Sequence, residues 1–248
     1  MLLRLPTTVS EAQECVAAGA VPIGGATLVW AGWQRDGFPE QAVSLRDLPE
    51  ANVLGPEELG AAVVLHRIDD RVPQVLREAA AGVGTGAVRR TATVGGNLVG
   101  SALRCLLPAA LVLDARATVL GPDGVHEADL TEVLAKRPVL LDLRWRAPVA
   151  SAYRKRAGAA GGPPPLVVAA AVHREDGTPA GTTHRLRVAV RDGYEVLGGS
   201  APCDADAEGV LRALRHSAFG TLRPTAWEEV HRHVAGLLDR ITGGADAG

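Results

Sequence analysis

The sequence predicts an α+β protein of two domains. Its apolar residues fall into short strand-like runs and helical spacings, without the regular β–α–β alternation of a doubly wound sheet. A chain of 248 residues, 47% of them hydrophobic and 22% charged, is long enough for two ordinary globular domains. Aromatic residues make up only 3%, so leucine, valine and alanine must fill the cores.

The N-terminal part combines one helix with short strands. Ser10 can cap a helix, Gln13 completes a capping box three residues later, and Gly19 ends the helix. Strands are expected where β-forming residues stand between turn-forming ones, at residues 21–23, 42–45 and 59–65.

Helical spacing marks the middle of the chain. Valine, leucine and alanine recur so as to predict an amphipathic helix over residues 72–83. A second helix over 106–113 tolerates Pro108 in its first turn. Strands are expected on the C-terminal side of this helix, at 117–120 and 139–145.

The C-terminal part begins after a Gly-Gly-Pro-Pro-Pro run, which makes residues 157–165 the clearest flexible segment. The elements expected beyond it are strands at 166–173, 184–190 and 194–197 and helices at 205–215 and 225–241. Residues 243–248 should form a frayed tail.

Two glycine pairs carry the chemistry. Gly24-Gly25 follows a short strand, and Gly95-Gly96 is expected in a turn. Glycine lets the backbone approach a ligand and adopt a positive φ, so that successive N–H groups can converge on an anion. Neither loop carries a Walker lysine, so amides and the hydroxyls of Thr27 and Thr93 would meet the charge. Taken singly, each pair is more simply explained as an ordinary turn.

A third glycine-rich stretch matches the dinucleotide fingerprint G-x-G-x-x-A at residues 82–87. That fingerprint requires a strand before it and a helix directly after it. Here a helix precedes it, and the helix opened by Pro108 begins about twenty residues later. The sequence therefore does not predict a Rossmann site.

The order of the two glycine loops resembles the FAD-binding medium subunit of molybdenum hydroxylases, the xanthine dehydrogenase and carbon monoxide dehydrogenase flavoprotein family. The first family motif is similar to VPIGGATL at residues 21–28, and the second to AVRRTATVGGNL at residues 87–98. Further matching segments lie at 106–115, 140–141, 151–155 and 226–233, so the resemblance spans nearly the whole chain.

The resemblance implies a set of FAD contacts. The residues that would wrap the pyrophosphate and ribityl chain are Pro22, Ile23, Gly24, Gly25, Ala26, Thr27 and Leu28. Those that would complete the phosphate and flavin walls are Val83, Gly84, Ala92, Thr93, Gly96 and Asn97. Leu140 and Leu141 would pack the adenine, with plain core as the alternative, and Lys155 would lie near the isoalloxazine ring.

Two departures from the family pattern stand out. Cys105 occupies the position of an acidic residue beside the flavin, and the run at 161–165 replaces an Asp or Tyr. They leave open a flavin-free scaffold subunit that keeps the fold. A stand-alone FAD-dependent oxidoreductase is a further alternative.

The architecture implied is a two-lobed FAD-binding domain of the vanillyl-alcohol-oxidase (PCMH) type over residues 1–150, with lobes of about 1–54 and 55–150. A small α+β domain with a three-stranded antiparallel sheet and helices would follow over 151–242, and 243–248 would form the tail. The function implied is an oxidoreductase subunit that passes electrons from iron–sulfur clusters through FAD to NAD⁺, oxygen or another acceptor.

Composition bears on partners and location. A net charge of −2 argues against nucleic acid, and no stretch is apolar enough to suggest a signal peptide or membrane span. Three dispersed cysteines, Cys15, Cys105 and Cys203, favour a reducing cytoplasm and cannot hold an iron–sulfur cluster. Neither His231 nor His233 is expected to bind a metal; both should be solvated. The resemblance therefore implies an iron–sulfur small subunit and a molybdopterin large subunit as partners.

Overall fold

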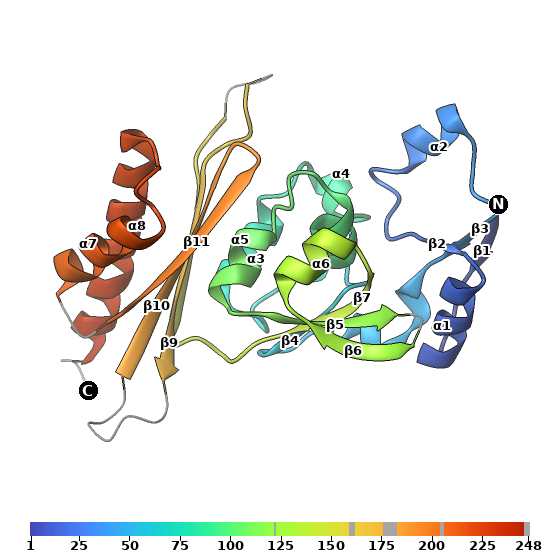
Figure 1. Cartoon of the computed structure of the whole chain (residues 1–248), viewed down its shortest axis with the longest axis horizontal. Coiled ribbons are helices and arrows are strands. Elements are labelled where there is room, and N and C mark those ends of the chain that lie inside the picture. Colours follow the sequence, from blue (N-terminus) through green and yellow to red (C-terminus); the bar gives the residue numbers. More distant parts are fainter. Residues whose placement is uncertain (122, 159–161, 176–182, 204–205, 246–248) are drawn as a thin grey trace. The chain divides into compact units, whose positions relative to one another are not determined.

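In the computed structural model, residues 1–121, 123–158, 162–175, 183–203 and 206–245 are described, with side chains as far as residue 241. The α+β fold class is confirmed: helices accompany three separate sheets (Figure 1). The chain forms two compact units. The first comprises Met1–Val72, Ala79–Leu106 and Ala115–Trp145, and the second Pro73–Glu78, Leu107–Asp114 and Arg146–Gly248. The division into domains at about residues 54, 150 and 242 stays a prediction.

The first unit begins with a small parallel sheet. Its strand order is β1–β3–β2, and the strands are β1 (Leu2–Arg4), β3 (Gln41–Val43) and β2 (Val21–Pro22). The seven-residue helix α2 (Trp30–Asp36), which was not predicted, lies between β2 and β3 in the chain. Two tryptophans of α2 pack edge to face against Phe38, whose ring centre lies 5.3 Å from that of Trp30 and 6.1 Å from that of Trp33.

Helix α1 (Val9–Ala17) has a different cap from the one predicted. The Thr8 hydroxyl accepts a hydrogen bond from the Glu11 N–H at 3.2 Å, and the Glu11 carboxylate accepts one from the Thr7 N–H at 2.8 Å. The prediction of Ser10 as the cap is wrong because the hydroxyl of Thr8, two residues earlier, already accepts from the Glu11 N–H.

The second sheet of the first unit is antiparallel, in the order β4–β7–β5–β6. Its strands are β4 (Glu58–Gly60), β7 (Val139–Arg144), β5 (Arg116–Gly121) and β6 (Gly124–Ala128). The expected strand 59–65 is wrong beyond Gly60, because the Val63 N–H turns back to the Gly60 carbonyl at 3.2 Å. The strand β6 was not predicted, since its residues are mostly exposed and show no apolar run.

Short helices connect these strands. They are η1 (Leu45–Asp47), η2 (Pro49–Asn52), η3 (Leu65–Arg67), α3 (Gln74–Ala81), α4 (Gly86–Arg89), η4 (Gly96–Gly100) and α6 (Leu130–Lys136). The helix predicted over 72–83 is confirmed as α3, whereas α4 and α6 were not predicted. Asp129 caps α6 by accepting from the Glu132 N–H at 2.8 Å, a signal that the sequence does contain.

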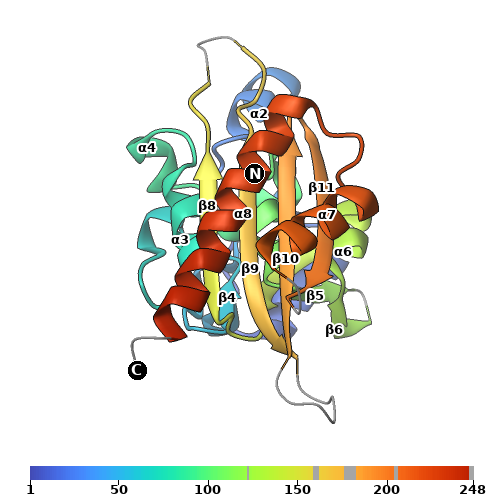
Figure 2. The same ribbon diagram turned by 90° about the vertical axis from the view of Figure 1, so that its left-hand side faces the viewer.

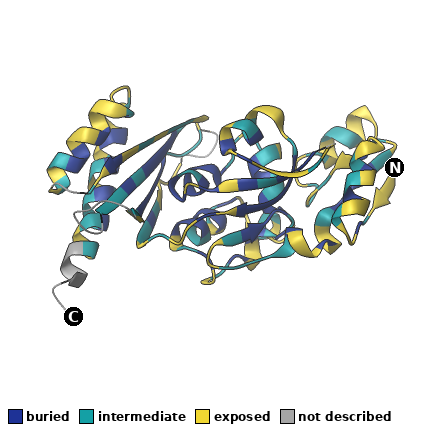
Figure 3. Cartoon of the chain, turned by 60° about the horizontal axis from the view of Figure 1, so that its bottom comes forward, coloured by how far each residue is buried: buried dark blue, intermediate teal, exposed yellow. Residues whose placement is uncertain are grey.

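The second unit is built on an antiparallel sheet of four strands in the order β11–β10–β9–β8. These are β8 (Ala150–Lys155), β9 (Val167–Glu175), β10 (Thr183–Asp192) and β11 (Glu195–Pro202). The expectation of three strands is wrong, because β8 adds to the edge of β9 through six residue pairs, Ala150↔Val172 to Lys155↔Val167. Figure 3 shows buried residues on both strands and helices, and in β9 every residue from Val167 to Val172 is buried.

Helices cover both faces of this sheet. Figure 2 shows α7 (Ala207–Ser217) and α8 (Pro224–Ala245) side by side over one face. Helix α5 (Leu107–Val112) packs against β9, β10 and β11 on the other face (Figure 1). Coverage on both faces explains why β9 is an uninterrupted apolar run rather than an alternating one.

Several expectations concern the ends of elements in this unit. The tail expected from residue 243 is helical as far as Ala245, and residues 246–248 lie outside the described residues. Residues 162–165 form no helix or strand, while 159–161 of the predicted flexible segment and Ala205 of the predicted helix also lie outside. Among the helices that the structure describes, none combines the length and apolarity needed to cross a membrane.

Candidate flavin site

The first glycine loop leaves the small parallel sheet at Pro22. The Ile23 N–H still donates to the Val43 carbonyl at 2.9 Å, after which the chain departs from β3. Ala26 has a left-handed φ of 58°, and its carbonyl accepts from the Trp30 N–H at 3.1 Å to open α2. The loop is thus fixed at both ends, and its solvent-exposed Leu28 lies within 4.0 Å of the Cβ position of Gly100.

The backbone N–H groups between these two anchors are unengaged. From Gly24 to Leu28, no amide donates a hydrogen bond to any residue in the described part of the chain. A run of free amides around a left-handed residue is a concave arrangement that binds anions. The first loop therefore has the donor set that a pyrophosphate requires.

The second glycine loop differs from the prediction. Gly95 and Gly96 were expected in a turn with positive φ, but Gly95 is helical with a φ of −60° and Gly96 begins η4. Their amides are already occupied: Gly95 donates to the Ala61 carbonyl at 2.8 Å, and Gly96 donates to the Thr93 Oγ1 at 3.1 Å. The expected cradle of free amides is wrong here. The segment at residue 61 already accepts a hydrogen bond from the Gly95 N–H, and the chain forms a helical turn.

Thr93 joins the two loops. It is buried, and its Oγ1 would lie 2.3 Å from a Cβ placed on Gly24. A Cβ on Gly25 would lie 1.7 Å from the Thr91 carbonyl oxygen. A side chain at either position would collide with the other loop, so both glycines are required for the loops to be in contact. Neither glycine has a left-handed φ. Because Oγ1 accepts from Gly96, the hydroxyl proton of Thr93 remains able to donate outward.

Asn97 and Cys105 lie at the far end of the second loop. The Asn97 side chain is buried, and its Oδ1 accepts from the Leu106 N–H at 2.9 Å. Cys105, next to Leu106, is also buried. Arg104 has a left-handed φ of 41°, and its Nε, shielded from solvent, has no hydrogen-bond partner among the described residues. Ala92, also predicted to contact FAD, is buried beside Thr93.

Val83 and Gly84 follow the end of α3. Val83 is buried, whereas Gly84 is exposed and has a left-handed φ of 46°. The turn is tight, since the Val83 N–H donates to the Ala80 carbonyl at 3.1 Å. Of the predicted glycine sites, Gly84 alone shows the positive φ for which glycine is suited.

Leu140 and Leu141 are neighbours on β7 and point to opposite faces of the sheet. Leu141 belongs to an apolar cluster with Ala12, Leu48 and Ala51, which is the core alternative. Its carbonyl accepts from the Ala61 N–H at 2.8 Å, so β7 supports the second loop through the same residue that binds Gly95. A role in packing adenine stays a prediction for both leucines.

Beside these leucines, Asp142 is a buried carboxyl on β7. Burial raises its pKa, while a hydrogen bond from the Thr118 hydroxyl at 2.8 Å and the charge of Arg144 act in the opposite direction. This group supports the sheet and does not belong to the loops.

Lys155 lies in the second unit, at the exposed end of β8. The expected place of Lys155 near the isoalloxazine ring stays a prediction.

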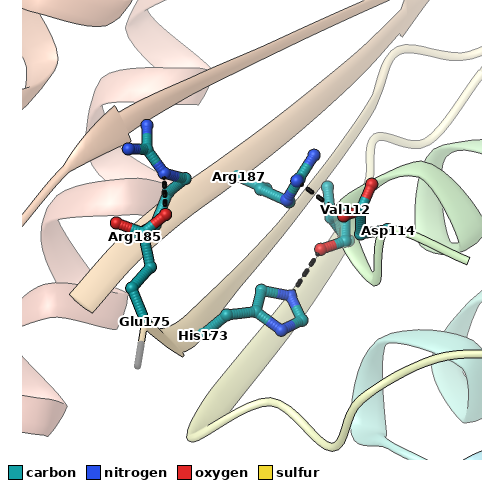
Figure 4. Close-up of polar contacts among 6 residues, drawn as sticks. All are labelled: Val112, Asp114, His173, Glu175, Arg185 and Arg187. Carbon is teal, nitrogen blue, oxygen red and sulfur yellow. Dashed lines mark hydrogen bonds and ion pairs between the residues drawn. The ribbon is translucent and has the colours of Figure 1, made fainter. Parts of the chain in front are cut away.

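A separate polar network in the second unit fastens α5 to the sheet (Figure 4). The His173 ring contacts the Val112 carbonyl at 2.8 Å, and Arg187 pairs with Asp114 at 2.7 Å. Because a carbonyl oxygen only accepts, the ring N–H donates to it, and burial lowers the pKa of His173. Arg185 and Glu175 form a further ion pair between adjacent strands. A structural role, joining α5 and the strands, therefore explains the polar residues of this network.

The histidines of α8 behave differently from each other. His231 is 43% exposed and contacts Glu208 at 3.1 Å, as a surface residue would. The expectation of a solvated His233 is wrong, because its Nε2 is buried without a partner among the described residues. Burial lowers the pKa of His233. Within the described residues, no three His, Cys, Asp or Glu side chains group as metal ligands.

Comparison with known families decides what the loops belong to. Residues 3–144, more than half of the chain, match the family described as "FAD binding domain in molybdopterin dehydrogenase". The chain belongs to this family. FAD is accordingly its cofactor, and the free amides of the first loop with the Thr93 hydroxyl provide donors that fit the FAD pyrophosphate.

Solved structures extend the likeness of this FAD-binding protein to the whole fold. It resembles a chain of Cu,Mo-CO dehydrogenase in its cyanide-inactivated form with a TM-score of 0.70 and 16% identity, covering 97% of this chain and 96% of that chain. For carbon monoxide dehydrogenase from Hydrogenophaga pseudoflava the TM-score is 0.67, with 18% identity and 96% of each chain covered. For quinoline 2-oxidoreductase from Pseudomonas putida 86 it is 0.65, with 17% identity, 99% of this chain and 98% of that chain. The comparison with curated proteins gives no match.

Proposed function

We propose that this chain is the FAD-binding, electron-relaying subunit of a molybdenum-hydroxylase-like oxidoreductase. FAD, when bound, accepts electrons and passes them on, while the protein supplies binding, orientation and electrostatics. The observation that carries the proposal is the run of unengaged amides from Gly24 to Leu28, held against the Thr93 hydroxyl by contact between two loops.

The loops would divide the work of binding between them. The first loop would donate its amides to the pyrophosphate, with the Thr27 and Thr93 hydroxyls as further donors. The second loop would serve as a rigid wall, because its own amides are already hydrogen-bonded within the protein. The remaining proposed contacts are Pro22, Ile23, Val83, Gly84, Ala92, Gly96, Asn97, Cys105, Leu140, Leu141 and Lys155.

Partners follow from the cysteine content. The full sequence has three cysteines, whereas a typical iron–sulfur cluster takes four cysteine thiolates. Electrons would therefore reach the FAD from an iron–sulfur small subunit, which in turn would serve a molybdopterin large subunit. The structurally similar proteins include CO dehydrogenase and quinoline 2-oxidoreductase, and this supports an oxidoreductase assembly.

A pull-down from the cells that produce the protein tests the proposal. The tagged chain would be purified by size exclusion, and the peak analysed for flavin by absorbance and for iron and molybdenum by mass spectrometry, with untagged cells as the control. FAD, iron and molybdenum in one peak are expected. A folded chain without flavin would instead indicate a scaffold, and flavin without either metal would indicate a stand-alone enzyme.

A further inference from the structure

Arg89, at the end of α4, reaches back to the turn that precedes its own helix. Its Nη1 donates to the Val83 carbonyl at 2.9 Å and to the Gly84 carbonyl at 3.0 Å. One guanidinium nitrogen thus bridges two successive carbonyl groups. A charged donor makes such hydrogen bonds stronger than neutral ones.

These bonds fix the orientation of two peptide planes. In a trans peptide the carbonyl and the N–H point in opposite directions. When the carbonyls of Val83 and Gly84 face Arg89, the N–H groups of Gly84 and Thr85 therefore face away from it. Neither of these amides donates to a residue in the described ranges.

The turn that Arg89 holds is also connected to the second glycine loop. A Cβ on Gly84 would lie 3.2 Å from the Val88 side chain, so α4 packs directly on the turn. The Val88 carbonyl then accepts from the Ala92 N–H at 2.8 Å and from the Thr91 N–H at 3.1 Å. Through α4 the turn is therefore tied to Thr91, whose carbonyl oxygen meets the first loop at Gly25.

We propose that Arg89 is a positioning residue for FAD, which turns the amides of Gly84 and Thr85 toward the cofactor by holding the carbonyls behind them. The inference rests on the proposed function, because it takes Val83 and Gly84 as part of the FAD site. Without the guanidinium, two carbonyl oxygens lose their donors and the peptides are free to flip. A carbonyl oxygen turned toward the cofactor would repel its phosphate groups.

The neighbouring Arg90 offers a matched control. It has the same charge, is exposed, and in the described structure makes no hydrogen bond to the turn. Both guanidinium groups approach the Cβ position of Gly86, with the Arg89 Nη2 and the Arg90 Nη1 each at 3.9 Å. Loss of Arg90 therefore removes equal charge from the same place but leaves the carbonyls of Val83 and Gly84 held.

The experiment titrates FAD into the apoprotein of the parent, Arg89→Ala, Arg89→Lys and Arg90→Ala. Flavin fluorescence gives the dissociation constant, and ¹⁵N amide spectra report Gly84 and Thr85. We expect Arg89→Ala to weaken FAD binding about ten- to a hundredfold, and Arg90→Ala less than about twofold. Arg89→Lys should recover part of the affinity, because a single ammonium can donate to both carbonyls. The FAD-induced shifts of the Gly84 and Thr85 amides should vanish in Arg89→Ala and return in Arg89→Lys.

Three results would overturn the inference. Parent-like affinity of Arg89→Ala for FAD would show that the hydrogen bonds from Arg89 to the two carbonyls are dispensable. Equal losses in Arg89→Ala and Arg90→Ala would assign the effect to charge alone. Lost affinity with unchanged FAD-induced shifts of Gly84 and Thr85 would assign the loss of affinity to general stability. If Arg89→Ala does not fold, the same comparison is made between Arg89→Lys and Arg90→Lys. Failure of the parent to bind FAD would refute the proposed function itself, and this inference with it.

Discussion

A methyl group at Gly25 is the sharpest perturbation of the contact between the glycine loops. The Cβ of Gly25→Ala would lie 1.7 Å from the Thr91 carbonyl oxygen, 2.3 Å from the carbonyl carbon and 3.0 Å from the Ala92 nitrogen. Non-bonded heavy atoms settle at about 3.5–4.0 Å, so the loops must separate by roughly 2 Å. All three atoms belong to the backbone, and no side chain can rotate away to make room.

Overpacking of this kind typically costs about 1–3 kcal/mol. Because the strain falls between the amide run and the backbone at Thr91 and Ala92, next to Thr93, most of it should appear as lost cofactor affinity, about ten- to a hundredfold. Titration of FAD into the apoprotein, followed by flavin fluorescence, measures this loss, and urea unfolding without FAD measures the effect on stability.

Gly32→Ala is the control for this variant. Gly32 lies in α2, close to the loop in sequence, and a Cβ there has no heavy atom within 4 Å. Alanine should be neutral or slightly stabilising in a helix, by up to about 1 kcal/mol. If Gly25→Ala binds FAD within twofold of Gly32→Ala, the loops do not meet as described and the reasoning fails.

Two further predictions concern the cofactor linkage and pH. The flavin should be noncovalent, so that precipitating the protein with acid releases all of it as FAD; flavin retained in the pellet, or released as FMN, would contradict this. His233 should make stability fall with acidification: burial lowers its folded pKa below the unfolded value of about 6.5, so its contribution is complete above that pH and is lost as the pH falls through the folded pKa. Between pH 7 and pH 5 the unfolding free energy of His233→Leu, measured with urea, should fall less steeply than that of the parent. An equally steep fall in both proteins would count against the burial argument.

Sequence patterns predicted the elements whose stability comes from long apolar faces. The helix α3 and the strands β7, β9 and β10 were predicted for this reason. Short elements such as α2 and β6 were missed, because neither shows a regular apolar period and tertiary contacts hold them. The fourth strand of the second sheet depends on pairing between β8 and β9, a contact that no local pattern encodes.

The glycine motifs located the site but did not reveal how it is built. Gly24 and Gly25 were expected to allow the close approach of a ligand, yet they allow the close approach of Thr91 and Thr93 of the other loop. The amide of Gly95 was expected to be free, yet Ala61 binds it. Both outcomes depend on segments more than thirty residues away in the chain. The hydrogen bonds of Arg89 to the carbonyls of Val83 and Gly84 likewise become visible only in the folded turn, although these partners are close in the chain.

The most direct test of the account is the ¹⁵N amide spectrum of the chain during titration with FAD. The amides from Gly24 to Leu28 should shift downfield as they donate to the pyrophosphate, with couplings to ³¹P across the new hydrogen bonds. Gly95 and Gly96 should keep their positions, because Ala61 and Thr93 already hold them. Phosphorus couplings at Gly95 and Gly96, with none from Gly24 to Leu28, would contradict the central claim.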